Sequence, residues 1–161
     1  MSSVTEVRRL GPDEWDLFRR LRLAALKEAP HAFGSTYESE VRAGDEWWRR
    51  RLADRARFVA EVDSEAAGTV SGGDSSTKGT AAITSMWVAP VYRRQGVGDM
   101  LIKTVLEWTR SNGYSDVVLW VTEGNANAEK LYERNGFART GEVNRVRAGE
   151  DRIEYEMARR L

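Results

Sequence analysis

The spacing of hydrophobic residues changes along the chain, and each change marks the limit of an expected element. Apolar residues that alternate with polar ones predict strands, whereas apolar residues that recur at helical spacing predict helices. In the first half of the chain these patterns predict, in order, a strand at 4–10, a helix at 12–28, a loop or short helical turn at 31–44, a helix at 45–54 capped by Asp45, and strands at 57–62, 66–71 and 80–88. Residues 72–79 (GGDSSTKG) have the composition of a flexible hairpin loop. We therefore expect these strands to form an antiparallel meander.

The second half of the chain alternates strands with helices. Its clearest helix covers residues 97–111, because Leu101, Val105 and Trp108 form one apolar stripe, and Asn112-Gly113 ends it in the manner of a left-handed cap. The remaining elements are predicted to be a strand at 116–122, a helix at 125–135, and strands at 137–140 and 152–158. Residues 116–122 are almost continuously apolar, which is typical of a strand buried on both faces. No repeat or linker interrupts the pattern, so we expect residues 1–161 to form a single domain of mixed α/β class.

The composition and the charge exclude several classes of protein. Of the 161 residues, 41% are hydrophobic and 31% charged, and the formal net charge is zero, so we expect a globular domain that does not bind nucleic acid. The chain has no Cys and a single His, His31, which excludes disulfides and thiolate nucleophiles and predicts no metal site. Because neither a secretory signal nor an apolar run of membrane-spanning length is present, we expect a cytoplasmic protein without a membrane partner. The oligomeric state stays open, a homodimer included.

One segment, residues 86–98, predicts a binding site for an anion. It runs from an expected buried strand through a short basic turn into the clearest helix, and the unpaired N–H groups and dipole at such a helix start attract anions. Gly96 and Gly98 let the backbone approach phosphate oxygens without a side-chain collision, and Arg93 and Arg94 add positive charge. A diphosphate group is therefore the natural ligand.

The glycines alone do not decide which diphosphate compound binds. A Walker A loop is excluded, because no Gly-Lys-Ser/Thr follows them. The dinucleotide site of an oxidoreductase is an alternative, because Gly96-Val97-Gly98 follows a strand and Glu123 comes after the next strand. Against it, Leu101 occupies the third glycine position and the upstream β-α-β-α-β pattern is missing. A basic helix start that holds no ligand is the other alternative.

Two blocks of the sequence resemble the GNAT family of acetyltransferases. The family's central motif, Arg/Gln-x-x-Gly-x-Gly/Ala, is matched by Arg93, Gly96 and Gly98, after a strand that ends in the family's hydrophobic-x-Val-x-Pro pattern at 86–90. A second family block, Asn-x-x-Ala-x-x-Leu-Tyr-Glu-x-x-Gly-Phe, is matched at Asn125, Ala128, Leu131, Tyr132, Glu133, Gly136 and Phe137. The resemblance is specific over residues 80–142. It implies the element order β-α-α-β-β-β-α-β-α-β-β, with a central mixed sheet flanked by helices.

The resemblance implies that acetyl-CoA is the cofactor and acetyl donor, with CoA as the product. In the family the central strand pairs with the pantetheine arm, the basic turn cradles the pyrophosphate, and an Asn contacts the cofactor. Carried over residue by residue, the cofactor-binding residues are Met86, Trp87, Val88, Arg93, Arg94, Gln95, Gly96, Val97, Gly98, Asp99, Asn125, Asn127 and Tyr132. Tyr132 matches the family's tyrosine that protonates the departing CoA thiolate, and a phenol suits this task because its pKa exceeds that of a thiol. Helical spacing alone favours a packing residue at Tyr132 and a helix N-cap at Asn125.

The reaction that the resemblance implies is direct attack by a neutral primary amine on the thioester in a ternary complex. A backbone N–H near Val88 would polarise the thioester carbonyl. Some family members carry a Glu on the central strand as the base, but this strand has no carboxylate. Glu38, Glu40, Glu123 and a water relay therefore stay open as alternatives.

The acceptor amine is the least determined part of the reaction. In the family the segment after the first helix usually lines the acceptor site, which makes Phe33, Tyr37, Trp47 and the neighbouring Trp48 candidate substrate residues, unless they belong to the core. We expect a small-molecule amine in preference to a protein N-terminus. A non-catalytic module of the same fold that binds or senses acyl-CoA is the alternative function.

Overall fold

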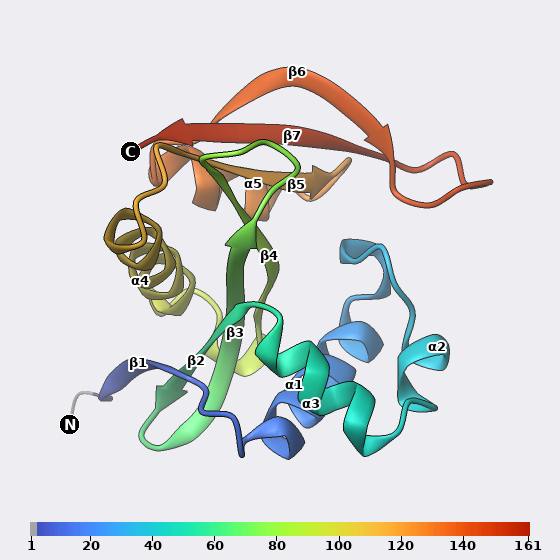
Figure 1. The fold of residues 1–161 in the computed structure, drawn as a ribbon, viewed down its shortest axis with the longest axis vertical. Coiled ribbons are helices and arrows are strands. Elements are labelled where there is room, and N and C mark those ends of the chain that lie inside the picture. The colour runs from blue at the N-terminus through green and yellow to red at the C-terminus, as the bar shows by residue number, and fades with distance from the viewer. Residues whose placement is uncertain (1–2) are drawn as a thin grey trace.

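The fold is a mixed sheet with helices on both faces (Figure 1). A computed structural model describes residues 3–161, so the first two residues of the expected domain lie outside the described part. The elements are β1 (Thr5–Arg9), α1 (Trp15–Glu28), the 3-10 helix η1 (Pro30–Ala32), α2 (Tyr37–Val41), α3 (Asp45–Ala53), β2 (Ala56–Val62), β3 (Glu65–Asp74), β4 (Thr80–Val88), the 3-10 helix η2 (Pro90–Tyr92), α4 (Val97–Ser111), β5 (Asp116–Thr122), α5 (Ala126–Arg134), β6 (Ala138–Arg145) and β7 (Ile153–Arg160). Seven strands pair in the order β1-β2-β3-β4-β5-β7-β6, with β4 and β5 parallel and the other neighbours antiparallel. The predicted fold class is confirmed.

Helices cover both faces of the sheet (Figure 1), and two separate clusters of apolar side chains are buried beneath them. α4 packs on one face, where Leu101, Ile102 and Val105 are fully buried against the strands. α1 and α3 pack on the other face around Trp48, whose side chain has no exposed surface and whose ring meets that of Phe18 edge-on. Burial of an apolar side chain of this size stabilises a fold by about 1.5–3 kcal/mol. Within residues 3–161, no helix is both long and apolar enough to cross a membrane.

Strand β3 is longer than the sequence predicts. The composition of residues 72–79 predicts a flexible loop, but β3 continues to Asp74, so this prediction is wrong for the start of the segment. A Cβ atom on Gly72 would lie 2.8 Å from Cγ2 of Val105 and 3.1 Å from Cζ3 of Trp108, both on α4. Gly72 is therefore needed because α4 packs directly on the strand backbone, and the chain does not turn there.

The first helix begins later than expected. The sequence predicts Pro12 in its first turn, but α1 starts at Trp15. The Glu14 carboxylate accepts hydrogen bonds from the backbone N–H of Gly11 (2.9 Å) and from the guanidinium of Arg8 (2.8 Å). These bonds hold the residues before α1 in a turn against β1, so the helix follows the turn.

Four other elements differ from the prediction in detail. Asp45 is the first residue of α3 and not its cap, because Gly44 takes the cap position. β5 is not buried on both faces, since the side chain of Trp120 is 36% exposed. β6 and β7 run past their expected ends to Arg145 and Arg160.

The two parallel strands pair at one end and separate at the other. The register of β4 and β5 covers Thr80–Ala82 against Asp116–Val118 and stops there. From residue 83 to residue 88, the edge of β4 that faces β5 has no partner strand. Ligands of open α/β sheets bind beside the carboxyl ends of parallel strands, so this separation marks the place for a site.

Candidate functional site

A cleft of about 690 Å³ opens between the separated ends of β4 and β5 and continues over the start of α4 and along α5. Most of the residues predicted to bind a cofactor line this cleft: Met86, Trp87, Val88, Arg93, Arg94, Gly96, Val97, Gly98, Asp99, Asn125, Asn127 and Tyr132. Gln95 does not line it, and its side-chain amide donates a hydrogen bond to the carbonyl of Val91 (3.0 Å). Two sequence blocks that are separated by a helix and a strand thus meet around one cavity.

The start of α4 is an open cradle of backbone N–H groups within this cleft. Gly96 caps the helix with a φ of +81°, a left-handed conformation, and a Cβ atom on it would meet nothing within 4 Å. Gly98 sits in a tighter place, because its Cβ would lie 3.2 Å from Cδ2 of Leu131 and 3.5 Å from Cε of Met86. The first N–H groups of a helix have no partner within the helix and carry partial positive charge. This end of α4 is therefore suited to bind an anion.

Asp99, in the first turn of α4, links the start of α4 to α5 through hydrogen bonds. Its carboxylate accepts hydrogen bonds from the guanidinium of Arg134 (3.0 Å) and from the side-chain amide of Asn135 (3.0 Å). The hydrogen bonds from these two residues, above all that from Arg134, lower the pKa of Asp99. The charges of Asp99 and Arg134 therefore offset each other, and the pair joins two walls of the cleft.

Two cations without an ion-pair partner within residues 3–161 line the cleft, Arg94 and Lys130. Arg93 differs from them, because its guanidinium pairs with Glu28 and donates a hydrogen bond to the backbone carbonyl of Val88 (2.9 Å). The positive charge available to an anion therefore comes from Arg94 and Lys130. The sequence motifs do not include Lys130, although helical spacing places it on the cleft-lining face of α5.

The unpaired edge of β4 adds polar backbone groups to the cleft. An extended ligand with amide groups can pair with such an edge as another strand would. The hydroxyl of Thr84, which lies on this part of β4, is buried without a hydrogen-bond partner among the described residues. An unpartnered buried hydroxyl next to a cleft fits a ligand that supplies the missing partner.

Tyr132 is a buried tyrosine that borders the cleft. It is 6% exposed, and its ring meets that of Phe137 edge-on at 6.1 Å. Its hydroxyl makes no hydrogen bond to any other residue in the range 3–161. Burial raises the pKa of Tyr132 above its ordinary value, so the hydroxyl is protonated at neutral pH and free to donate to a ligand.

Asn125 forms the N-cap of α5. Its Oδ1 accepts a hydrogen bond from the backbone N–H of Ala128 (3.3 Å), which is the role that helical spacing alone favours. Because the cap uses only the carbonyl oxygen of the side chain, the amide NH₂ group of Asn125 is still available on the cleft side.

A second pocket, of about 430 Å³, lies on the other side of η1 from the cleft. The segment between β6 and β7 borders it, and there Arg147 donates a hydrogen bond to the carbonyl of Gly34 (2.7 Å) and Arg152 donates one to the carbonyl of His31 (2.7 Å). Both arginines line the pocket together with residues of α1 and α2. A segment distant in sequence thus forms a wall that the sequence patterns did not predict.

The residues predicted to contact the acceptor are separated by the fold. Phe33 lines the cleft, and Tyr37 lines the second pocket. Trp47 lines neither, because its ring packs against that of Trp48 at a centroid distance of 4.7 Å, next to α1 and α3. Trp48 therefore belongs to the hydrophobic core, and Trp47 packs against that core, partly buried.

The three carboxylates considered as bases also lie in different places. Glu38 lines the second pocket, and Glu123 lines neither cavity. Glu40 is 4% exposed and forms a two-pronged ion pair with Arg22 (2.9 and 3.0 Å). Burial acts to raise the pKa of Glu40, but the hydrogen bond and charge of Arg22 outweigh it, and the pKa is lowered. Glu40 is therefore ionised but already occupied by its partner.

Comparison with known proteins identifies relatives over most of the chain and over a shorter stretch of it. The model of the acetyltransferase (GNAT) family matches residues 18–137. The chain is 27% identical over 139 residues to an uncharacterized N-acetyltransferase of Archaeoglobus fulgidus. This match covers 83% of this chain and 93% of the archaeal protein. It is 39% identical over 57 residues to N-acetyltransferase 8 of Homo sapiens, which covers 35% of this chain. The match spans only 25% of the length of the human relative.

A solved structure shows the same fold. A protein of Salmonella typhimurium, described as an acetyltransferase and solved with its cofactor acetyl-CoA, superposes with a TM-score of 0.77 over 98% of this chain and 94% of its own. The two sequences are 21% identical, so the likeness establishes the fold and leaves the ligand of this cleft to be argued from its own residues.

Proposed function

The chain belongs to the acetyltransferase (GNAT) family, and on this premise we propose that it transfers an acetyl group from acetyl-CoA to a primary amine, directly and within a ternary complex. The observation that carries the proposal is the cleft between β4 and β5. This one cavity contains an anion cradle at the start of α4, an unpaired strand edge and the protonated hydroxyl of Tyr132.

The parts of the cleft correspond to the parts of acetyl-CoA. The N–H groups at the start of α4 would hold the pyrophosphate, and the charges of Arg94 and Lys130 would add to their attraction. The unpaired edge of β4 would pair with the amide groups of the pantetheine arm. When bound there, the thioester supplies an activated acetyl group. A helix start that holds no ligand would not need an unpaired strand edge beside it.

The residues of the cleft then have separate tasks in the transfer. Backbone N–H groups of β4 beyond residue 85 would polarise the thioester carbonyl. The amine nitrogen forms a bond to the carbonyl carbon, and the bond from that carbon to sulfur breaks. The Tyr132 hydroxyl would give its proton to the departing sulfur, and the amine would lose a proton to water or to a base.

The second pocket supports a small amine as the acceptor. It is bordered by the β6–β7 segment, which Arg147 and Arg152 tie to the backbone of residues 31–34. A pocket of this size fits a small amine, whereas an extended protein segment needs a groove that runs up to the thioester. Phe33, which lines the cleft next to η1, is the residue of the acceptor side that we expect the amine to meet.

Binding of the donor is tested first, by thermal unfolding with CoA and with acetyl-CoA. Both should raise the melting temperature, and at a ligand concentration about 100-fold above the dissociation constant the gain in stability should be about 2.7 kcal/mol. NAD(H) is the control, since it also carries a diphosphate. No shift with CoA or acetyl-CoA, or an equal shift with NAD(H), would contradict the assignment of the cleft.

Transfer is tested next, with a panel of amines and detection of free CoA thiol. Release of CoA that depends on both amine and protein is the expected result. Small amines should react faster than peptides with a free N-terminus. Tight binding of acetyl-CoA without release of CoA by any amine of the panel would favour the non-catalytic acyl-CoA-binding module.

A further inference from the structure

Strand β4 carries a bulge at Ser85, next to the expected position of the acetyl group. Thr69 pairs with Trp87 and Ser71 pairs with Thr84, so β4 has one residue more than β3 between these pairs. Ser85 has a φ of +56°, in the left-handed region that residues other than glycine seldom adopt. A bulge of this kind bends the strand and redirects the backbone groups that follow it. These groups belong to the stretch of β4 that lines the cleft.

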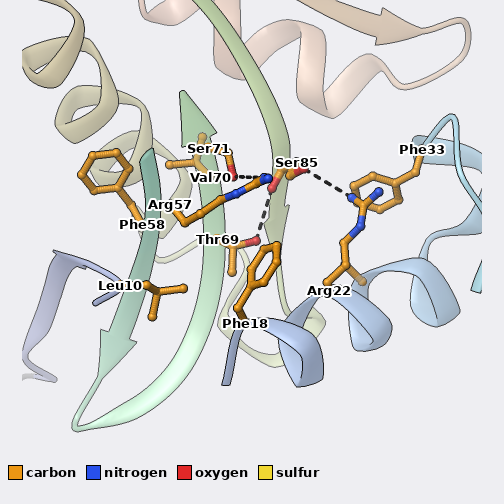
Figure 2. Close-up of a pocket in the computed structure, with 11 residues that line it drawn as sticks. Leu10, Phe18, Arg22, Phe33, Arg57, Phe58, Thr69, Val70, Ser71 and Ser85 are labelled. Atoms are coloured by element: carbon orange, nitrogen blue, oxygen red, sulfur yellow. Dashed lines mark hydrogen bonds between the residues drawn. The ribbon is translucent and has the colours of Figure 1, made fainter. Parts of the chain in front are cut away.

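Two side chains hold Ser85 in this conformation (Figure 2). The hydroxyl of Thr69 donates a hydrogen bond to the Ser85 carbonyl (3.2 Å), and the guanidinium of Arg22 donates one to the Ser85 hydroxyl (3.3 Å). Arg22 approaches from α1, and the ring of Phe33 lies 5.1 Å from its guanidinium carbon. The bulge is therefore held from its own sheet and also from the helical layer.

Arg22 is itself fixed by an ion pair between two helices. Its Nε and Nη2 donate to the two carboxylate oxygens of Glu40 on α2, at 2.9 and 3.0 Å, which leaves Nη1 directed at Ser85. Arg22 is 9% exposed and Glu40 is 4% exposed. A buried ion pair adds little net stability compared with apolar residues of similar size, because both charges lose their hydration. A role in fixing geometry accounts better for a charged pair in this place.

The position of the pair joins the two sides of the proposed reaction. Ser85 and Phe33 line both the cleft and a small enclosed cavity beside Arg22, so the bulge is the partition between them. α1 and α2, which carry Arg22 and Glu40, also line the second pocket. A shift of these helices would therefore move the bulge, and a shift of the bulge would move the helices.

We propose that Arg22 is a positioning residue, which is held by Glu40 and fixes the Ser85 bulge so that the backbone of β4 meets the thioester carbonyl in the correct direction. This role rests on the proposed acetyl transfer. It assigns Arg22 no contact with the donor, so the affinity for CoA should not depend on Arg22. It also links the acceptor-side helices to the site of transfer.

The test compares Arg22→Lys, Ser85→Ala and the double variant. Lys keeps the charge beside Glu40 but lacks the planar fork with which Arg22 reaches both carboxylate oxygens and Ser85, whereas Ser85→Ala removes only the hydroxyl and leaves the ion pair intact. Each single variant should lower turnover roughly 10- to 100-fold, because a small misplacement of reacting groups costs this much. The Kd for CoA should not change. The double variant should be no slower than the slower single one, because both changes break one contact.

The matched control is Arg57→Lys. Arg57 lines the same enclosed cavity and is 4% exposed, but it donates to the hydroxyl of Ser71 (2.9 Å) and to the end of α3, and among the described residues it makes no hydrogen bond to Ser85 (Figure 2). This variant should lose stability and keep its turnover. If Arg22→Lys does not fold, Ser85→Ala still tests the contact.

A second measurement is independent of activity. Amide hydrogen exchange at residues 86–88 should become faster in Arg22→Lys and Ser85→Ala, while exchange at residues 80–82, where β4 pairs with β5, should stay as in the parent. If exchange becomes faster in the two variants but the parent protein has no transferase activity, the role of Arg22 is upheld and the proposed function is contradicted. Parental turnover and parental exchange in both single variants, or additive losses in the double variant, would overturn the role of Arg22.

Discussion

Replacement of Tyr132 by Phe separates a catalytic tyrosine from a packing one. The side chain is 6% exposed, and its ring packs edge-on against Phe137. Phe keeps these contacts, and the hydroxyl has no hydrogen bond within residues 3–161 to lose. We therefore expect the free energy of unfolding to change by less than about 1 kcal/mol. The affinity for acetyl-CoA should also be close to that of the parent.

Turnover should respond differently, because the substitution removes the proposed proton donor. General-acid catalysis contributes about 10²- to 10⁴-fold, and we expect the low end because a thiolate is already a tolerable leaving group. A loss of about 10²-fold corresponds to about 2.7 kcal/mol of transition-state stabilisation. Burial raises the pKa of Tyr132, so its hydroxyl stays protonated well above neutral pH. The ratio of the parent rate to the variant rate should therefore be constant from about pH 7 to pH 9.

Single-turnover rates with pre-bound acetyl-CoA are the proper measurement, because slow product release can hide a loss in the chemical step. Tyr92→Phe is the matched control, since Tyr92 lines the same cleft from η2 and has no proposed role in proton transfer. It should react at the parental rate. Equal single-turnover rates for Tyr132→Phe and the parent would refute the reasoning and make Tyr132 a packing residue.

Three other substitutions test the cradle, the packing and the electrostatics. Gly96→Val places a β-branched side chain at a φ of +81° and should weaken CoA binding strongly in a titration. The control is Gly44→Ala, whose Cβ meets nothing within 4 Å and which should bind CoA as the parent does. Equal affinities of the two variants for CoA would show that the anion cradle is not at Gly96. Gly72→Ala should lower the free energy of unfolding, measured in urea, by about 1–3 kcal/mol because its Cβ meets α4. Gly73→Ala should lower it less, because its Cβ meets the movable side chain of an arginine. The reverse order would contradict the packing of α4 on Gly72. Burial raises the pKa of Glu154, so the ionised group opposes folding, and stability is lost as the pH rises through that raised pKa. Glu154→Gln should therefore raise the melting temperature at pH 7 and leave it unchanged at about pH 3, below the ordinary pKa of Glu; equal melting temperatures at both would contradict the desolvation.

The features that the sequence predicted well are those fixed by neighbouring residues. The limits of α4 agree with the prediction because glycines mark both ends, and both adopt left-handed φ angles, +81° at Gly96 and +80° at Gly113. The apolar stripe between them is local as well. The meeting of the two motif blocks at one cleft was predictable only through the family resemblance, since no local pattern indicates which side of α5 faces β4.

The features that the sequence did not predict have causes that lie far away along the chain. Gly72 has the local signature of a loop, but its reason is contact with α4, which begins after another strand. Arg22 lies between two leucines on the buried side of α1, and its partner Glu40 comes 18 residues later. A charged residue among buried apolar positions is the signal that could have indicated an internal ion pair.

The cleft itself depends on the places where local rules are broken. The pairing of β4 with β5 stops after Ala82, and three residues later Ser85 adopts a left-handed φ. The bulge bends β4, and the hydrogen bonds from Thr69 and Arg22 stabilise it. A sequence whose local preferences all agreed would close the sheet and leave no unpaired edge for a ligand. The strained backbone of Ser85 and the buried charge of Arg22 both destabilise the fold, and we expect them in a sheet that opens to form a binding cleft. In a sheet with continuous pairing neither feature would have a function.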